Sequence, residues 1–348
     1  MWQPFPGNQH RLIGWFAYLG TKRLKREVRR VTFYSIQRHR LSNMSELAKT
    51  VTGFLAVIYY WIESIVLFFV PVRLKAKDIS GELVLVTGAG NGLGRSTALK
   101  FAEKGCNVVL WDINTKGNEE TAAMLREKGA KAYPYEVDVT ISEAVYSAAA
   151  KVKQDAGIVT IVVNNAGIVA GKSILDLEEK SIRKVFDVNV LAHFWVIKAF
   201  LPDMLEKDRG HLVTISSLAG LGGSPKLTDY CASKFAACGL MDALQIELHA
   251  DGRKNIHTTV ICPFFINTGM FNGATTRIFS NLNPDFVAEE IVTSVMCNKS
   301  LVLIPRFFHA LYQLKVLMPA RSFLALHDAT GGTDSMTKFT GRNSKKVQ

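Results

Sequence analysis

Seven short apolar runs lie between residues 82 and 305, and longer stretches with a helical repeat separate most of them. Short apolar runs bounded by polar residues are typical of buried strands, whereas apolar residues with a 3.6-residue repeat are typical of helices that cover a sheet. This alternation predicts an α/β fold, a doubly wound parallel sheet covered by helices on both faces. The expected strands are Leu83–Val86, Asn107–Trp111, Ala132–Val139, Val159–Val163, Leu212–Ile215, Thr258–Ile261 and Leu301–Ile304.

A longer apolar run, residues 51–72, precedes the first expected strand and is interrupted only by Glu63. About twenty apolar residues in a helix can cross a hydrocarbon core of about 30 Å, so this run predicts a membrane anchor. Glu63 would cost roughly 2.5 to 3.5 kcal/mol at the centre of a spanning helix. The segment therefore either gives Glu63 a partner and crosses the bilayer, or enters one leaflet as a monotopic anchor. The sequence leaves both open.

Most of the excess charge lies ahead of this run. The chain has 42 Lys and Arg against 30 Asp and Glu, a net charge of +12, and residues 1–50 hold ten of the cations against two carboxylates. Such a segment suits an anionic partner, either nucleic acid or a membrane. Because it precedes a membrane segment rather than an aromatic reading surface, we expect a membrane and no nucleic acid. Residues 1–43 could form a transit peptide, an interfacial helix or a solvated tail.

The composition and the cysteines narrow the class of protein further. A hydrophobic content of 48% and a mean hydropathy of +0.12 exclude a disordered chain. The five cysteines are scattered, without a CxxC pair or metal-ligand spacing, so we expect a reducing compartment and no metal site. We interpret Cys106, Cys238 and Cys262 as small buried hydrophobic residues.

A glycine-rich segment follows the first expected strand directly and leads into an amphipathic helix. Gly88, Gly92 and Gly94 allow a tight turn, close approach of the backbone to a pyrophosphate, and packing of helix on strand. Asp112 ends the next strand, 18 residues beyond Gly94. A carboxylate there accepts hydrogen bonds from both ribose hydroxyls of NAD and repels the additional phosphate of NADP. With no basic residue directly beside Asp112 to offset it, the pattern favours NAD over NADP.

Three further motifs follow in order: Asn164-Asn165-Ala166-Gly167, then Ser217, then Tyr230-Cys231-Ala232-Ser233-Lys234. Together with the glycine-rich segment they resemble the short-chain dehydrogenase/reductase family over about residues 80–305. The resemblance implies a single Rossmann-type domain. It also marks Asn189, 24 residues after Asn165, as a fourth catalytic position.

The chemistry of these four residues can be stated in physical terms. Oxidation of an alcohol needs a base for the hydroxyl proton, and a tyrosine with an ordinary pKa near 10 is not ionised at pH 7. Lys234 lies one helical turn from Tyr230 and, with a positive nicotinamide ring, should favour the phenolate. Ser217 would hydrogen-bond the substrate oxygen, and Asn189 would hold a water that carries the proton onward from Lys234.

The resemblance implies additional contacts to the cofactor. It also reveals one departure, since the family usually has a glycine after Pro263, where this chain has Phe264 and Phe265. We expect these two aromatic residues to line the substrate side. The implied cofactor-binding residues are Thr87, Gly88, Asn91, Gly92, Leu93, Gly94, Asp112, Asp138, Val139, Asn165, Tyr230, Lys234, Pro263, Ile266 and Thr268.

Three longer segments, residues 109–114, 229–237 and 262–271, resemble the membrane-bound retinol dehydrogenase branch of this family. That resemblance implies an NAD-dependent oxidoreductase that converts a lipophilic alcohol, with all-trans-retinol to retinal as the leading reaction. A 17-beta-hydroxysteroid, another sterol or a long-chain alcohol is the alternative substrate, and a catalytically silent lipid-droplet scaffold is the alternative function. The implied location is the endoplasmic reticulum membrane, the lipid droplet or both, with the catalytic domain facing the cytosol. A homodimer is left open.

The C-terminal stretch, residues 306–326, places Phe308, Leu311, Tyr312 and Lys315 on one helical stripe before Pro319 interrupts it. Such a stripe suits either the headgroup boundary of a membrane or a lid packed on the domain. The expected organisation is a basic extension at 1–50, an anchor at 51–72, the Rossmann domain at 80–305, and an amphipathic segment with a basic tail at 306–348.

Overall fold

The computed structural model describes residues 46–341, which fall into two compact units divided after Pro71. In the first unit, α3 (Glu46–Phe69) is a continuous helix of 24 residues. At about 1.5 Å per residue it is roughly 36 Å long, enough to cross a bilayer core. Its apolar side chains are exposed, among them Phe54 at 69% and Trp61 at 73%. This helix is a candidate membrane anchor, as the apolar run predicted.

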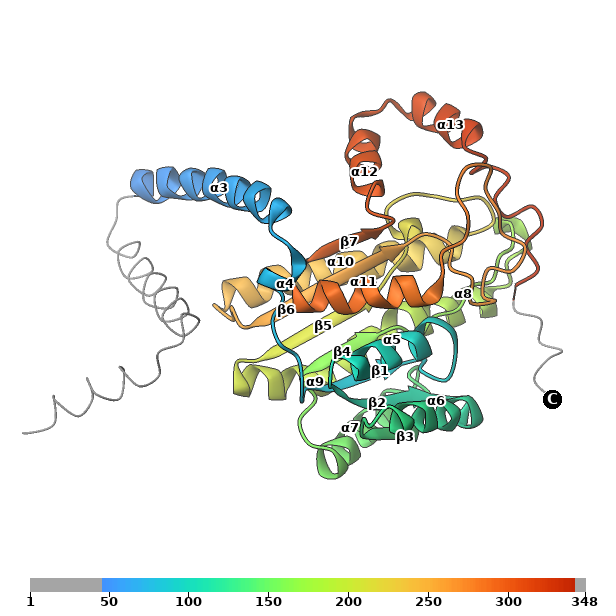
Figure 1. Ribbon diagram of the computed structural model, residues 1–348. Helices are drawn as coiled ribbons and strands as arrows, with labels where there is room; N and C mark the ends of the chain where they lie inside the picture. Colours follow the sequence, from blue (N-terminus) through green and yellow to red (C-terminus); the bar gives the residue numbers. More distant parts are fainter. Residues whose placement is uncertain (1–45, 342–348) are drawn as a thin grey trace, which may run out of the picture. The chain divides into compact units, whose positions relative to one another are not determined.

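The second unit is built on a seven-stranded sheet in which every pair of neighbouring strands is parallel (Figure 1). All seven predicted strands are present, which confirms the predicted doubly wound fold. The spatial order is β3-β2-β1-β4-β5-β6-β7. The strands are β1 (Leu83–Thr87), β2 (Asn107–Asp112), β3 (Ala132–Glu136), β4 (Ile161–Asn164), β5 (Gly210–Ile215), β6 (Ile256–Pro263) and β7 (Leu301–Ile304).

Helices cover both faces of this sheet and bury two separate apolar clusters. Side chains of α5, α6 and α11 pack on one face, and those of α7, α9 and α10 pack on the other (Figure 1). The strands are buried on both sides, which explains their continuous Val, Ile and Leu sequences. The helices are α4 (Val72–Lys75), α5 (Gly92–Glu103), α6 (Thr115–Glu127), α7 (Ser142–Asp155), α8 (Glu179–Phe186), α9 (Ala192–Lys207), α10 (Thr228–Ala250) and α11 (Pro284–Met296), with short turns η1 (Ile174–Asp176), η2 (Asp187–Leu191) and η3 (Leu218–Gly220).

The continuous helical stretch Glu179–Lys207 is also long and apolar enough to cross a membrane by length and composition. Half of its most apolar window is buried, however, and Val196, Ile197 and Phe200 pack in the cluster beneath α9. Its apolar residues therefore belong to the core of the domain.

The order of the strands reverses between β1 and β4, because the chain adds β2 and β3 on one side of β1 and β4 to β7 on the other. In a doubly wound sheet the loops that leave the carboxyl ends of the strands separate at this point and leave a crevice. The glycine-rich segment, Asn165 and Ser217 all follow strand ends at this edge. The topology therefore gathers the predicted motifs in one place.

The C-terminal residues form a wall next to this edge. α12 (Phe308–Leu317) and α13 (Ala320–Ala329) are separated by Pro319, as the sequence predicted. The chain then returns to the loop at residues 269–277, where Thr275 N donates to Ser335 O at 3.0 Å and Thr340 N to Asn272 O at 2.9 Å.

The sequence left open whether the stripe on α12 faces a headgroup boundary or packs as a lid on the domain, and its contacts favour the lid. The Lys315 ammonium donates to the carbonyl of Leu221 and lies 5.3 Å from the ring centre of Phe323. The apolar residues that α12 exposes are instead on another face, with Val316 at 69% and Leu317 at 81%. The predicted stripe therefore lines the interior of the domain.

Candidate active site

The glycine-rich segment forms a tight loop between β1 and α5. Gly92 has a φ of +54°, a left-handed conformation that side chains disfavour. A Cβ on Gly94 would lie 2.1 Å from the carbonyl oxygen of Gly88, so no side chain fits there. The side chain of Asn91 makes no capping bond to α5. Gly92 and Leu93, in the first turn of α5, face a cavity of about 1280 Å³, where helix amides suit an anion.

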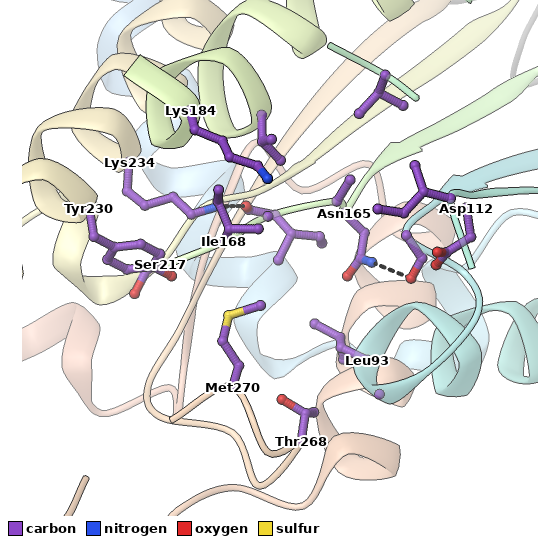
Figure 2. A pocket seen from close by; sticks show the side chains of 18 of the residues that line it. Leu93, Asp112, Asn165, Ile168, Lys184, Ser217, Tyr230, Lys234, Thr268 and Met270 are labelled. Atoms are coloured by element: carbon purple, nitrogen blue, oxygen red, sulfur yellow. Dashed lines mark hydrogen bonds between the residues drawn. The ribbon is translucent and has the colours of Figure 1, made fainter. Parts of the chain in front are cut away.

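A network of hydrogen bonds ties this loop to the end of β4. The Thr87 hydroxyl accepts from the amides of Asn165 and Ala166, each at 3.0 Å. The Asn165 side chain in turn donates to the carbonyls of Thr87 at 2.8 Å and Gly88 at 3.2 Å. Figure 2 shows Asn165 at the edge of the cavity, between Ile168 and Asp112. Thr87 and Asn165 therefore fix the floor of the loop.

Asp112 ends β2 at the far end of the same cavity (Figure 2). Its two carboxylate oxygens accept from the amides of Gly90 and Asn114, each at 2.8 Å, which joins β2 to the glycine loop. Carboxylate oxygens can accept more than one hydrogen bond, so these amides leave acceptor capacity for ribose hydroxyls.

Arg95, a cation bound to the loop, is held by backbone carbonyls and a carboxylate. Arg95 donates to the carbonyls of Gly90 at 2.6 Å and Gly117 at 3.0 Å and forms an ion pair with Glu120 at 3.0 Å. It does not line the cavity. The donor and acceptor set therefore fits a nicotinamide dinucleotide: a glycine cradle for the pyrophosphate and a carboxylate for a ribose.

Tyr230 and Lys234 lie one helical turn apart on α10, at the opposite end of the cavity from Asp112 (Figure 2). Both are buried, with 4% and 3% of their surface exposed, and the Lys234 ammonium lies 5.7 Å from the centre of the Tyr230 ring. Lys234 Nζ donates to the carbonyl of Ile215 at 2.8 Å. This bond directs the ammonium toward the cavity floor beside the tyrosine.

Burial moves the pKa values of the two residues in opposite directions. It raises the pKa of Tyr230 above its ordinary value, opposed by a hydrogen bond with Ser217. It lowers the pKa of Lys234 to about 8. Burial of the tyrosine hydroxyl therefore acts against the phenolate that the lysine was expected to favour. The change in Lys234 places its titration near neutral pH, where a proton carrier is most useful.

Ser217 follows β5 and begins the turn η3. Its hydroxyl accepts from the amide of Ala219 at 3.1 Å and lies 3.5 Å from the carbonyl oxygen of Pro263, the last residue of β6. Ser217 and Tyr230 both line the cavity, so their hydroxyls can contact the same substrate oxygen.

Asn189 is fully buried in the π-helical turn η2. Its side chain accepts from Ile168 N at 2.9 Å and donates to Ile168 O and Ser233 Oγ, each at 3.0 Å. A Cβ on Gly167 would lie 3.4 Å from Asn189 Oδ1 and 3.6 Å from Lys234 Nζ, so the two groups approach the same point. Both amide hydrogens of Asn189 are used, so a water held by its side chain would have to donate to Oδ1.

A second cavity of about 320 Å³ opens beside Ser217 and Tyr230 and is mostly apolar. Phe264 stacks on Phe308 of α12 with ring centres 5.6 Å apart, and Phe265 contacts Phe271 at 5.0 Å. Phe264 and Phe265, which follow Pro263 where a glycine was expected, both line both cavities. The larger cavity has hydrogen-bonding groups at both ends, and we call it the polar cleft. The geometry brings this cleft and the apolar pocket together at Tyr230.

Most of the predicted site residues face the larger cavity, and the others lie behind its surface. Three predicted residues do not line the cavity but contact residues that do. Thr87 accepts a hydrogen bond from Asn165 and Asn189 accepts one from Ile168, while Gly94 lies against Gly88. Thr268 closes over the loop, since a Cβ on Gly92 would lie 3.1 Å from Thr268 Cβ. The predicted residues that line it are Gly88, Asn91, Gly92, Leu93, Asp112, Asp138, Val139, Asn165, Ser217, Tyr230, Lys234, Pro263, Phe264, Phe265, Ile266 and Thr268.

The sequence did not indicate several other lining residues. Ile168, Lys184 and Met270 point into the cavity (Figure 2), and Leu326 and His327 of α13 line the apolar pocket. Lys184 comes from α8, whose strong amphipathic pattern could have marked an inward face, but no local motif indicates the others. Among residues 46–341 no group of three or more potential ligands is placed to hold a metal ion.

Comparison with known proteins agrees with this geometry. The sequence profile of the short chain dehydrogenase family matches residues 82–278. The chain is 46% identical to epidermal retinol dehydrogenase 2 of Homo sapiens over 273 residues, covering 77% of this chain and 88% of the relative. It is 42% identical to 17-beta-hydroxysteroid dehydrogenase 13 of Homo sapiens over 273 residues, covering 78% and 90%.

Solved structures with the same fold contain either form of the cofactor. A short chain dehydrogenase/reductase from Burkholderia phymatum in complex with NAD matches with a TM-score of 0.64 and 26% identity, covering 69% of this chain and 94% of that one. A metagenomic short-chain oxidoreductase in complex with NADP matches with a TM-score of 0.57 and 26% identity, covering 66% and 98%.

Proposed function

The chain belongs to the short-chain dehydrogenase/reductase family. From this premise we propose that it uses NAD to oxidise a lipophilic alcohol, with all-trans-retinol to retinal as the leading reaction. The observation that carries the proposal is the position of Tyr230, which lies where the polar cleft meets the apolar pocket. A cofactor in the polar cleft and a lipid alcohol in the apolar pocket would meet at the Tyr230 hydroxyl.

The polar cleft would hold the cofactor through the groups described above. The amides of the first turn of α5 would bind the pyrophosphate, Asp112 the adenosine ribose, and the segment from Pro263 to Thr268 the nicotinamide. The bound cofactor supplies the acceptor for the hydride that leaves the alcohol carbon. Asp138 and Val139, which line the same cavity, would pack against the adenine ring.

The residues of the chain handle the proton. Ser217 donates to the substrate oxygen and orients it, and Tyr230 takes the hydroxyl proton as negative charge develops on that oxygen. Before this step the neutral Lys234, whose pKa burial lowers to about 8, accepts the proton of the Tyr230 hydroxyl, and its ammonium then stabilises the phenolate. Asn189 fixes Ile168 and the helix beside Lys234.

The choice of NAD rests on Asp112, whose carboxylate faces the cleft while the nearby Arg95 is occupied by carbonyls and Glu120. Steady-state kinetics with both cofactors tests it. We expect wild-type protein to prefer NAD and Asp112→Ala to lose at least about tenfold of that preference, because a phosphate dianion beside a carboxylate is repelled even through solvent. A wild-type preference for NADP would contradict the assignment.

The substrate class rests on the apolar pocket and on the names of the relatives, one a retinol and one a hydroxysteroid dehydrogenase. Its volume of about 320 Å³ is within the range of ligand pockets. Purified full-length protein with NAD should form NADH and retinal from all-trans-retinol. A higher kcat/KM for a 17-beta-hydroxysteroid, another sterol or a long-chain alcohol would assign the alternative substrate.

A catalytically silent scaffold on lipid droplets is the second candidate, because the exposed apolar helix α3 suits a lipid surface whether or not the site turns over. The same panel of retinoids, sterols and fatty alcohols separates the two functions. NAD binding by calorimetry without turnover of any alcohol would favour the scaffold.

We place the enzyme on the endoplasmic reticulum membrane, the lipid droplet or both, anchored by residues 51–72, with the catalytic domain in the cytosol. The five cysteines are free, which suits a reducing compartment. Deleting residues 51–72 should release active protein to the soluble fraction. Protease added to intact microsomes should degrade the catalytic domain, and protection until detergent is added would place it in the lumen.

A homodimer through α9 and α10 is a further part of this proposal. Phe194 on α9 and Phe235 on α10 are 40% and 47% exposed, and Ile246 on α10 is 63% exposed. Exposed apolar side chains of this size suit a contact between copies of the chain. Light scattering of the detergent-solubilised protein tests it, and a monomer at micromolar concentration would contradict it.

A further inference from the structure

Two cysteines lie directly behind the catalytic residues. Cys238 is one helical turn beyond Lys234 on α10, and Cys262 is in β6 immediately before Pro263. Both belong to the apolar cluster between α10 and the sheet, although they are separated by 24 positions in the sequence. The fold therefore brings two thiols together at the point where α10 meets β6.

Ser216 connects the two cysteines to the site. The Cys238 thiol donates to Ser216 Oγ at 3.2 Å, and the Ser216 hydroxyl donates to the carbonyl of Lys234 at 3.0 Å. The amide of Ser216 bonds to Ile261 O at 2.8 Å, which places Ser216 beside Cys262. Each of the two thiols also shifts the pKa of the other, as expected for neighbouring groups.

The sequence suggested that both thiols are inert hydrophobic groups, but their surroundings make them unequal. The contact with Cys262, against the effect of burial, lowers the pKa of Cys238 to about 7, and Ser216 and the Lys234 ammonium act in the same direction. The same contact and burial raise the pKa of Cys262 well above its ordinary value. For comparison, burial raises the pKa of Cys106 to about 12.

Access to the pair is also unequal. Cys262 is fully buried, whereas Cys238 is only partly buried. Reaction with an oxidant requires a thiolate that a small molecule can reach, followed by a second thiol close enough to resolve the product. Cys238 meets the first requirement and Cys262 the second.

We propose that Cys238 and Cys262 form a reversible dithiol site that hydroperoxides oxidise to a disulfide, and that this disulfide reduces the activity of the enzyme. The Cys238 thiolate attacks the peroxide oxygen, the O–O bond breaks, and Cys238 becomes a sulfenic acid while hydroxide leaves. The Cys262 thiol then displaces water from that sulfur, so two thiols and one peroxide give one disulfide and two molecules of water. A thiol reductant reverses the reaction by exchange.

The position of the pair explains why oxidation would affect turnover. A disulfide requires an S–S distance of about 2 Å, shorter than any contact between separate thiols, so α10 and β6 must shift relative to one another. Lys234 lies one turn from one sulfur, and Pro263, beside Ser217, follows the other. The cross-link itself does not depend on the proposed function, but its effect on turnover rests on it.

The experiment uses the full-length protein in detergent, treated with hydrogen peroxide and then alkylated and digested without reductant. Mass spectrometry should find a peptide pair joined through Cys238 and Cys262, and dithiothreitol should remove it. NADH formation from all-trans-retinol should fall at least about fivefold in parallel and recover with the reductant, within the range that misplacement of catalytic groups produces. Cys238→Ala should keep its activity under peroxide, whereas the matched control Cys297→Ala should lose activity like the wild type.

Each outcome decides one point. Oxidation of Cys297 without a Cys238–Cys262 peptide at the same peroxide concentration would overturn the dithiol site. The joined peptide with unchanged turnover would overturn its effect on activity. If no alcohol is oxidised even under reducing conditions, the proposed function fails, while the peptide analysis still decides whether the disulfide forms. Loss of cofactor binding on oxidation, measured by NADH fluorescence, would support the effect independently of turnover.

Discussion

The two sides of the site are constructed in different ways. The cofactor side is built from consecutive elements, β1, the glycine loop, α5 and the end of β2, and its contacts are mainly hydrogen bonds to backbone groups. The substrate side is built from the segment after β6, α12, α13 and the C-terminal residues, and its contacts are mainly between aromatic rings. The first fixes one ligand geometry, whereas the second offers a surface that different lipids could share.

Tyr230 belongs to both sides, so its substitution should have the largest effect. We expect Tyr230→Phe to lower kcat for alcohol oxidation by about 10³-fold, because loss of a proton-transfer group typically costs 10²- to 10⁴-fold. The ring would remain in contact with Phe271, so the variant should fold and bind NAD. NADH formation and calorimetry measure the two properties, and unchanged turnover would remove Tyr230 as the base.

The cofactor side should tolerate even one added methyl group poorly. Gly94→Ala would place a Cβ 2.1 Å from the backbone oxygen of Gly88, so the loop must move, and we expect about 10²-fold weaker NAD binding, since overpacking shifts the backbone. Gly223→Ala is the matched control on the substrate side, because nothing lies within 4 Å of its added Cβ. Equal NAD affinity in the two variants would show that the loop geometry is not required.

Substitutions on the substrate side should change KM for the alcohol and leave KM for NAD unchanged. Phe308→Ala removes the ring that stacks on Phe264, and we expect KM for all-trans-retinol to rise about tenfold, because one lost hydrophobic contact is worth a few kcal/mol at most. Leu317→Ala, at an 81% exposed position of the same helix, should leave it unchanged. A matching change in KM for NAD would contradict the separation of the two sides.

The same contrast explains what the sequence could predict. Gly88, Gly92, Gly94 and Asp112 were predicted because a tight turn and a strand end impose local requirements on residue type. The seven strands were predicted because burial on both faces requires continuous apolar runs. By contrast, nothing near His327 or Met270 in the sequence indicates that they face a ligand cavity, since distant segments place them there.

Local patterns also failed where a tertiary contact changed the outcome. Thr140 and Glu143 have the spacing of a capping box for α7, yet the Thr140 hydroxyl donates to Asp138 Oδ1 at 2.7 Å and Ile141 occupies the capping position. The stripe that contains Lys315 left a membrane boundary and a lid both open, and only the contact with the carbonyl of Leu221 favours the lid. Cys238 resembled an inert core residue because its neighbours Ser216 and Cys262 come from segments distant in the sequence.

The smallest effect we expect is a pH dependence that arises where the two sides meet. Burial lowers the pKa of Lys234 to about 8, so below that pH the group is protonated and cannot accept the proton of the alcohol. Oxidation at saturating NAD should therefore rise several-fold between pH 7 and pH 8 and level off above it, as expected for a group that must be deprotonated. Reduction of the aldehyde needs the protonated group and should show the opposite trend.

Because Lys234 touches the cofactor cleft and not the apolar pocket, Phe308→Ala should leave the midpoint unchanged. A midpoint that shifts in Phe308→Ala would show that the substrate side also influences the pKa of Lys234. The two sides of the site would then be coupled rather than independent.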